Sequence, residues 1–90
     1  MKTLSPELKE FMRNLFAQES ITLNVINQIE RVWNVDITCS NKDFFMAGFN
    51  LMYISNSTSD LYVETGKMRY ISLQGEVFKI ANEIQNSFEK

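Results

Sequence analysis

The residues that could carry acid–base chemistry are five carboxylates spread along the chain: Asp36, Asp43, Asp60, Glu64 and Glu76. Catalysis by paired carboxylates needs two groups held in different environments, with one of them removed from water. No pair here has a spacing that enforces such a difference. The chain also has no histidine, which removes Ser–His and Cys–His catalysis and every metal site that needs imidazole.

The remaining reactive features are equally weak. Cys39 is the only cysteine, and no basic residue stands beside it to lower its pKa; Lys42 follows three positions on. Thr65-Gly66-Lys67 has the last letters of a phosphate-binding loop without its upstream glycine, and Asp60 lacks the pattern of a calcium loop. We therefore expect no enzymatic activity, no cofactor and no metal.

Composition bounds the class of protein. The 90 residues are 44% hydrophobic and 12% aromatic, with a net charge of −2, which is typical of one folded domain covering residues 1–90. This balance disfavours a general nucleic-acid binder. The single cysteine and the charged first twenty residues indicate the cytoplasm rather than secretion. A short, acidic, histidine-free chain of this kind is also common among small accessory proteins of bacteria and phages.

The elements that would position these residues begin with two amphipathic helices, over residues 6–18 and 23–34. Ser5 and Thr22 are the expected N-caps, and Pro6 takes the first helical position. Apolar residues recur at steps of three and four in both segments, which predicts an αα-hairpin.

The middle of the chain has signals of both helix and strand. Residues 35–39 alternate like a short strand, and Ser40 with Asp43 resembles a capping box. Residues 42–55 are apolar almost throughout, and the length of the run favours a helix while its aromatic content favours a strand. We expect a helix over 42–51, with a strand as the open alternative.

The last third predicts a β-hairpin and a helix. Residues 56–60 have loop chemistry, and β-favouring residues at 61–64 and 68–72 flank the turn around Gly66. A helix over 74–88, capped by Ser72, completes the chain. The resulting fold is α+β: an αα-hairpin, a mixed apolar middle segment, a β-hairpin and a C-terminal helix packed on a small antiparallel sheet.

The apolar middle segment and the aromatic hairpin carry the functional hypothesis. A small domain has little room to surround such an apolar segment, so another chain would cover part of it. Tyrosine and arginine on the hairpin are residue types enriched at protein interfaces. We expect a cytoplasmic protein-binding module that acts stoichiometrically as an inhibitor, immunity factor or regulator, with a protein partner or a homodimer, and no membrane. The expected partner-binding residues are Phe45, Phe49, Met52, Tyr53, Tyr62, Arg69 and Tyr70.

The alternative is a DNA-binding transcription regulator of the helix-turn-helix type. Asn24, Asn27, Gln28 and Arg31 fall on the polar side of the second helix, and their side chains suit the edges of bases. The turn has no glycine, Glu30 lies beside this face, and few basic residues flank it to hold phosphates. Nucleic acid is therefore the less favoured partner.

Overall fold

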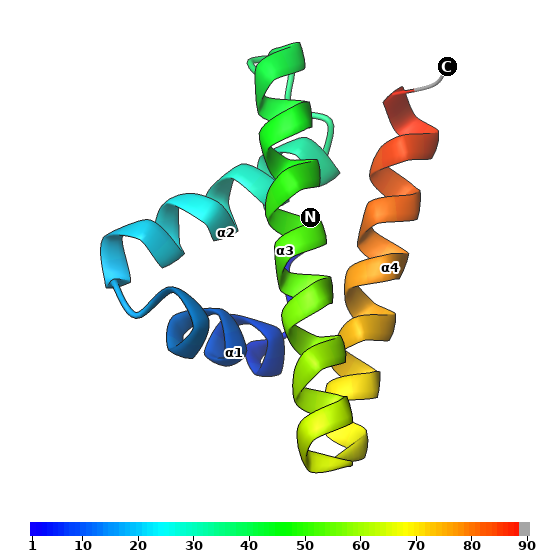
Figure 1. Ribbon diagram of the computed structural model, residues 1–90. Helices are drawn as coiled ribbons and strands as arrows, with labels where there is room; N and C mark the ends of the chain where they lie inside the picture. The colour runs from blue at the N-terminus through cyan, green and yellow to red at the C-terminus, as the bar shows by residue number, and fades with distance from the viewer. Residues whose placement is uncertain (89–90) are drawn as a thin grey trace. The chain divides into compact units, whose positions relative to one another are not determined.

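The protein is all helical. The computed structural model describes residues 1–88, and that range contains four α-helices and no strand (Figure 1). The helices are α1 (Pro6–Phe16), α2 (Glu19–Trp33), α3 (Asn41–Thr65) and α4 (Met68–Phe88). The predicted α+β fold with an antiparallel sheet is therefore wrong. The chain divides into two compact units, Met1–Ala47 and Gly48–Lys90, and each is described by itself.

Helix α1 begins as its sequence predicts. The Ser5 hydroxyl accepts a hydrogen bond from the Leu8 backbone N–H at 3.1 Å, and Pro6 occupies the first turn. The helix ends at Ala17, whose left-handed backbone lets its N–H donate to the Arg13 carbonyl at 3.1 Å. Leu8 and Met12 are buried, and α1 packs against α2.

Helix α2 begins earlier than predicted. Its N-cap is Gln18, which makes no side-chain capping bond. Thr22, the predicted cap, is instead a buried residue inside the first turn, where its hydroxyl donates to the Gln18 carbonyl at 2.9 Å. That bond satisfies a buried hydroxyl within the helix, so the residue that suits a cap also fits here.

The N-terminal segment is tied to the far end of α2. The Lys2 N–H donates to the Asn34 side chain at 2.8 Å, and the Asn34 amide donates back to the Lys2 carbonyl at 2.8 Å. The Leu4 N–H donates to the Glu30 carboxylate at 2.9 Å, while the Leu4 side chain is buried. The Lys2 ammonium lies over the Trp33 ring, 5.8 Å from its centre. These contacts hold the chain start in place within the first unit.

Helix α2 ends in a Schellman motif rather than leading into a strand. The Val35 N–H donates to the Val32 carbonyl at 3.1 Å, and the Asp36 N–H donates to the Arg31 carbonyl at 3.0 Å. Val35 has φ 54°, the left-handed conformation that this motif requires. The short strand predicted over 35–39 is therefore wrong, because these residues turn the chain from α2 into α3.

Helix α3 confirms the capping box and the helical reading of the middle segment. The Ser40 N–H donates to the Asp43 carboxylate at 2.9 Å, and the Asp43 N–H donates to the Ser40 hydroxyl at 3.2 Å. The helix continues well beyond 51, through the predicted loop at 56–60. There the Ser57 and Thr58 hydroxyls donate back to carbonyls of the same helix, at 2.9 and 2.7 Å.

The predicted β-hairpin is a helical hairpin. Residues 61–64 end α3 and residues 68–72 begin α4, so the two segments are not strands. Gly66, with φ 70°, makes the turn between them, as its position predicted. Within the second unit, residues 48–65 of α3 run antiparallel to α4 (Figure 1), and the Gln74 amide donates to the Ser59 hydroxyl at 3.0 Å across them.

Helix α4 begins at Met68 rather than near 74, so Ser72 lies inside it and caps nothing. Its buried residues recur at steps of three and four along one face: Tyr70, Leu73, Val77, Ile80 and Ile84. The predicted apolar stripe of the C-terminal helix is thus present and extends a turn further toward the N-terminus.

Candidate functional site

The two faces of α3 carry side chains of an unexpected size. Its buried face consists mainly of small and medium residues, including Ala47, Leu51, Ile54 and Thr58. Its exposed face carries the larger apolar residues. A helix stabilised only by packing within its own chain would place the larger apolar residues inward. The exposed apolar face of α3 is therefore the feature that the fold leaves unexplained.

We call this exposed apolar face the α3 stripe. It comprises five residues whose relative exposure lies between 41% and 63%: Phe45, Met46, Phe49, Met52 and Tyr53. They recur at steps of three and four, so successive members lie about one turn apart along a single helix. The rings of Phe44 and Phe45 are in edge contact, with centroids 5.5 Å apart, which fixes the aromatic end of the stripe.

Polar residues bound the stripe at both ends. Lys42 is exposed before it, and Asn56, Asp60 and Glu64 are exposed after it. Lys42 is the only basic residue of α3, and the neighbouring Asp43 is half-buried and bonded to Ser40 in the capping box. Phe49 lies at the centre of the apolar run. The stripe is therefore flanked by one exposed lysine on its N-terminal side and by exposed carboxylates beyond Asn56 on its C-terminal side.

Four of the seven predicted partner-binding residues belong to this stripe: Phe45, Phe49, Met52 and Tyr53. The other three lie elsewhere. Tyr62 is half-buried near the end of α3. Tyr70 is only 7% exposed, and the Arg69 guanidinium both covers its ring at 4.9 Å and donates to its hydroxyl at 2.9 Å. The predicted pairing of Tyr62 with Tyr70 across a β-ladder is wrong because no strand is present among residues 1–88.

The predicted partner-binding residues leave out other apolar residues that the structure exposes. Met46 belongs to the stripe, and helical spacing from Phe49 and Tyr53 would have placed it there once the segment was known to be a helix. On α4, Met68, Ile71 and Phe78 are exposed at steps of three and seven. The turn after α2 also exposes Val35 and Ile37. These smaller groups lack the run of consecutive turns that distinguishes the α3 stripe.

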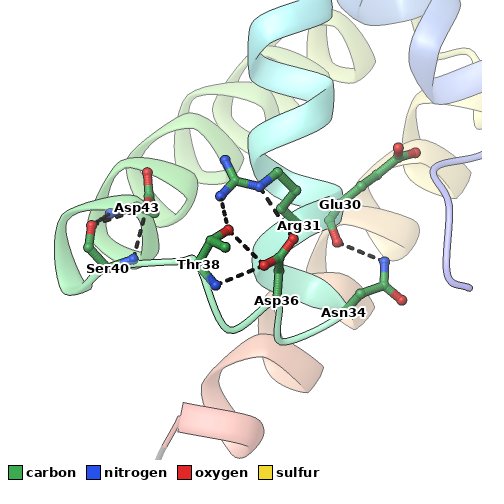
Figure 2. Close-up of polar contacts among 7 residues, drawn as sticks. All are labelled: Glu30, Arg31, Asn34, Asp36, Thr38, Ser40 and Asp43. Carbon is green, nitrogen blue, oxygen red and sulfur yellow. Dashed lines mark hydrogen bonds and ion pairs between the residues drawn. The ribbon is translucent and has the colours of Figure 1, made fainter.

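The residues of the nucleic-acid alternative are divided by the structure. Asn24 and Asn27 are exposed on α2. The Arg31 guanidinium instead donates to the Thr38 hydroxyl at 2.6 Å and lies 3.6 Å from the Asp36 carboxylate (Figure 2). Gln28 hydrogen-bonds to Asp43. Arg31 and Gln28 therefore hold the turn between α2 and α3, whereas only the two asparagines are presented on the surface.

Two carboxylates in this turn are held in their charged form. Hydrogen bonds from the side chain and backbone of Thr38 lower the pKa of Asp36, with a further contribution from Arg31. The backbone and hydroxyl of Ser40 lower the pKa of Asp43 in the same way. Figure 2 shows both sets of bonds on the path from α2 to α3. These carboxylates are suited to fixing a turn rather than to accepting a catalytic proton.

Cys39 lies between these carboxylates and is half-buried as a free thiol. Removal from water raises its pKa; the nearby Arg31 opposes this shift, and Asp36 and Asp43 add to it, so the pKa is raised on balance. A nucleophilic cysteine needs the opposite shift. Within residues 1–88, no group of three or more acidic or cysteine side chains is placed to hold a metal ion.

The helices described here also lack the combination of length and apolarity that crossing a membrane requires. Comparisons of the chain with protein-family models, curated proteins and solved structures gave no match.

Proposed function

We propose that this chain is a small cytoplasmic protein-binding module that acts stoichiometrically, as an inhibitor, immunity factor or regulator, through the α3 stripe. The observation that carries the proposal is that α3 exposes two phenylalanines, two methionines and a tyrosine, whereas its buried positions, including Ala47, Leu51, Ile54 and Thr58, hold no aromatic residue. Leaving large apolar side chains in water forgoes about 1.5–3 kcal/mol for each one that could be fully buried.

The composition of the stripe suits a protein surface. Aromatic residues and methionine are enriched at the centres of protein interfaces, and methionine adapts its shape to a partner. The single tyrosine supplies a polar end at the edge of the apolar strip. The charged residues stand beyond the apolar run, as in an interface with an apolar centre and a polar rim.

Reading of DNA by α2 has less support. A guanidinium that already bonds to Thr38 and Asp36 would have to leave both to contact a base. Residues 17 and 18, which join α1 to α2, include no basic residue that could bind a phosphate beside Asn24 and Asn27.

The proposal is tested by capture from a lysate of the native host with three immobilised proteins: the natural chain, Phe49→Asp and Phe78→Asp. Phe78 is the matched control, because it is a phenylalanine with 54% exposure that lies on α4 outside the stripe. We expect the natural chain and Phe78→Asp to retain the same protein in stoichiometric amount, and Phe49→Asp to lose it. Equal retention by all three, or no retained protein, would contradict the proposal.

A further inference from the structure

We infer that the α3 stripe binds a second copy of this chain, with the two α3 helices antiparallel and the two-fold axis at Phe49. This inference rests on the proposed function because both use the same stripe, and it names one partner of that stripe. Two independent features of α3 support it: the symmetry of the apolar residues about Phe49 and the distribution of exposed charge.

The apolar residues are arranged symmetrically about Phe49. Phe45 and Tyr53 lie four residues before and after it, and Met46 and Met52 lie three residues before and after it. A two-fold dimer uses the same patch on both subunits, so that patch must complement itself. In an antiparallel pair centred at Phe49, the two Phe49 rings meet, each Phe45 lies beside Tyr53 of the second copy, and each Met46 lies beside Met52.

The apolar run also stops at equal distances on both sides. Seven residues from Phe49, the exposed residue is Lys42 on one side and Asn56 on the other. An antiparallel pair in this register therefore buries every member of the stripe and places polar groups at both ends. Shifting the register by one turn would oppose an aromatic ring with Asn56 or Lys42.

The charges select the antiparallel direction. Lys42 lies near the N-terminal end of α3, and Asp60 and Glu64 lie toward its C-terminal end, all exposed. Neither Lys42 nor Asp60 takes part in an ion pair within the described part of the chain. An antiparallel pair brings Lys42 beside Asn56 of the second copy, with Asp60 one turn beyond it, whereas a parallel pair would oppose like charges.

The helix dipole supports the same choice. A cation near the N-terminus and an anion near the C-terminus are each disfavoured by the dipole of their own helix. At the N-terminal end of α3, Asp43 of the capping box stands beside Lys42, so the dipole there is already complemented. The C-terminal end has Glu64 and no basic residue in its last turn. Glu64 is therefore the charge that is better placed near the opposite pole of an antiparallel neighbour.

The association is tested by sedimentation of the purified protein between about 1 and 100 µM, a range that spans ordinary weak and moderate dimers. We expect a dimer that Phe49→Asp weakens at least about 100-fold and that Phe78→Asp leaves unchanged. Circular dichroism of Phe49→Asp should match that of the natural chain, which separates lost association from lost folding. A monomer throughout, or equal weakening by both variants, would overturn the inference.

The charge pairing is tested by exchange. Lys42→Glu and Asp60→Lys should each weaken the dimer about 3-fold, as exposed ion pairs do, and the double variant should recover the natural affinity. Additive weakening in the double variant would contradict the antiparallel register.

The direction is tested by a spin label at residue 63 in the Val63→Cys, Cys39→Ser variant. Val63 is 84% exposed and lies two heptads beyond Phe49. In the antiparallel dimer the two labels lie about 40 Å apart, because each residue advances the helix by about 1.5 Å. In a parallel pair they would lie about 10 Å apart, which would overturn the inference.

These measurements use the purified protein alone. A monomeric result overturns the assignment to a second copy while stripe-dependent capture of a different protein still supports the proposed function. A dimer that captures no other protein supports the assignment to a second copy and contradicts the proposed function. The two proposals can therefore fail separately.

Discussion

Val35 is a β-branched residue held with φ 54° at the end of α2. Its left-handed backbone completes two hydrogen bonds of the Schellman motif, a position where glycine is usual. A side chain with a Cβ costs about 1–2 kcal/mol in this conformation. The turn therefore forms with local strain at Val35, next to the contacts that join Arg31, Asp36 and Thr38.

Val35→Gly should relieve that strain. The valine side chain is 51% exposed, so little packing is lost. After allowing for the larger backbone entropy that glycine has in the unfolded chain, we expect the free energy of unfolding to rise by about 0.5–1 kcal/mol. Urea unfolding of the two proteins measures this difference. A decrease would show that the valine side chain makes a stabilising contact that outweighs the strain.

The same turn makes the free energy of unfolding depend on pH in the acid range. The pKa values of Asp36 and Asp43 are lowered in the folded protein from the ordinary 3.8. Protonation is therefore easier in the unfolded chain, and the stabilisation from both groups is complete above 3.8. It is lost as the pH falls from there through the lowered values.

Replacing both groups, in Asp36→Asn with Asp43→Asn, should flatten this dependence. We expect the double variant to be less stable than the natural chain at neutral pH and to change less with pH in the acid range. Unfolding by urea at a series of pH values from neutral to strongly acid gives both curves. Parallel curves would show that the acid dependence arises from other carboxylates.

At the scale of the helix, α3 is unusual because large aromatic residues and methionines lie on an exposed face. Ile54 is fully buried, whereas Phe49 is 63% exposed on the opposite face. Burial, rather than residue size, should therefore decide the effect of truncation within this helix.

Ile54→Ala should lower the free energy of unfolding by about 2–4 kcal/mol, whereas Phe49→Ala in the monomeric form should change it by less than about 1 kcal/mol. Thermal unfolding monitored by circular dichroism, at a protein concentration low enough to avoid association, provides the comparison. A larger loss from Phe49→Ala would place its ring in the core and remove the basis for the stripe.

Two glycines of the second unit allow a helical position, Gly75, to be compared with a turn position, Gly66. Gly75 lies exposed inside α4, and a Cβ added there would meet nothing within 4 Å. Gly75→Ala should raise the free energy of unfolding by about 0.5–1 kcal/mol, since alanine restricts the unfolded chain more and favours the helix.

Gly66→Ala is the matched control. It also has open space around it, but its φ of 70° makes a side chain unfavourable, so the variant should be destabilised by about 1 kcal/mol. Thermal unfolding of both variants gives opposite shifts in the midpoint. A gain in both would indicate that the turn adopts another backbone conformation.

The elements that the sequence could predict are those with a strong local signal. Ser5 and the Ser40–Asp43 pair mark helix starts by hydrogen bonds within one turn, and Gly66 marks a bend by its conformational freedom. Each of these signals operates over about four residues and does not depend on the rest of the fold.

The errors arose where local preference competed with the longer helix. Residues 56–60 are typical of loops, yet Ser57 and Thr58 satisfy their hydroxyls on helix carbonyls, and Thr58 is buried on the inner face. Likewise, the β-favouring Tyr62 and Tyr70 lie in helices whose apolar residues continue at helical spacing. The stripe was predicted in part: four of its five members follow from the surplus of apolar residues in this segment, whereas their common face depends on the segment being a helix.

At the scale of the whole molecule, large apolar residues occupy one exposed surface, the α3 stripe. Elsewhere, Ser5 caps α1 and the Ser40–Asp43 pair caps α3, so these polar side chains are explained by the helix starts. The α3 stripe is the surface whose residue types are instead explained by contact with another protein chain.

The most direct test places a photoreactive benzoylphenylalanine at position 49, with position 78 as the control, and illuminates each protein in a lysate of the native host. The account predicts a specific cross-linked protein, either a second copy or another chain, from position 49 and none from position 78. No adduct from position 49, or the same adducts from both positions, would contradict the claim that the α3 stripe is a protein-binding surface.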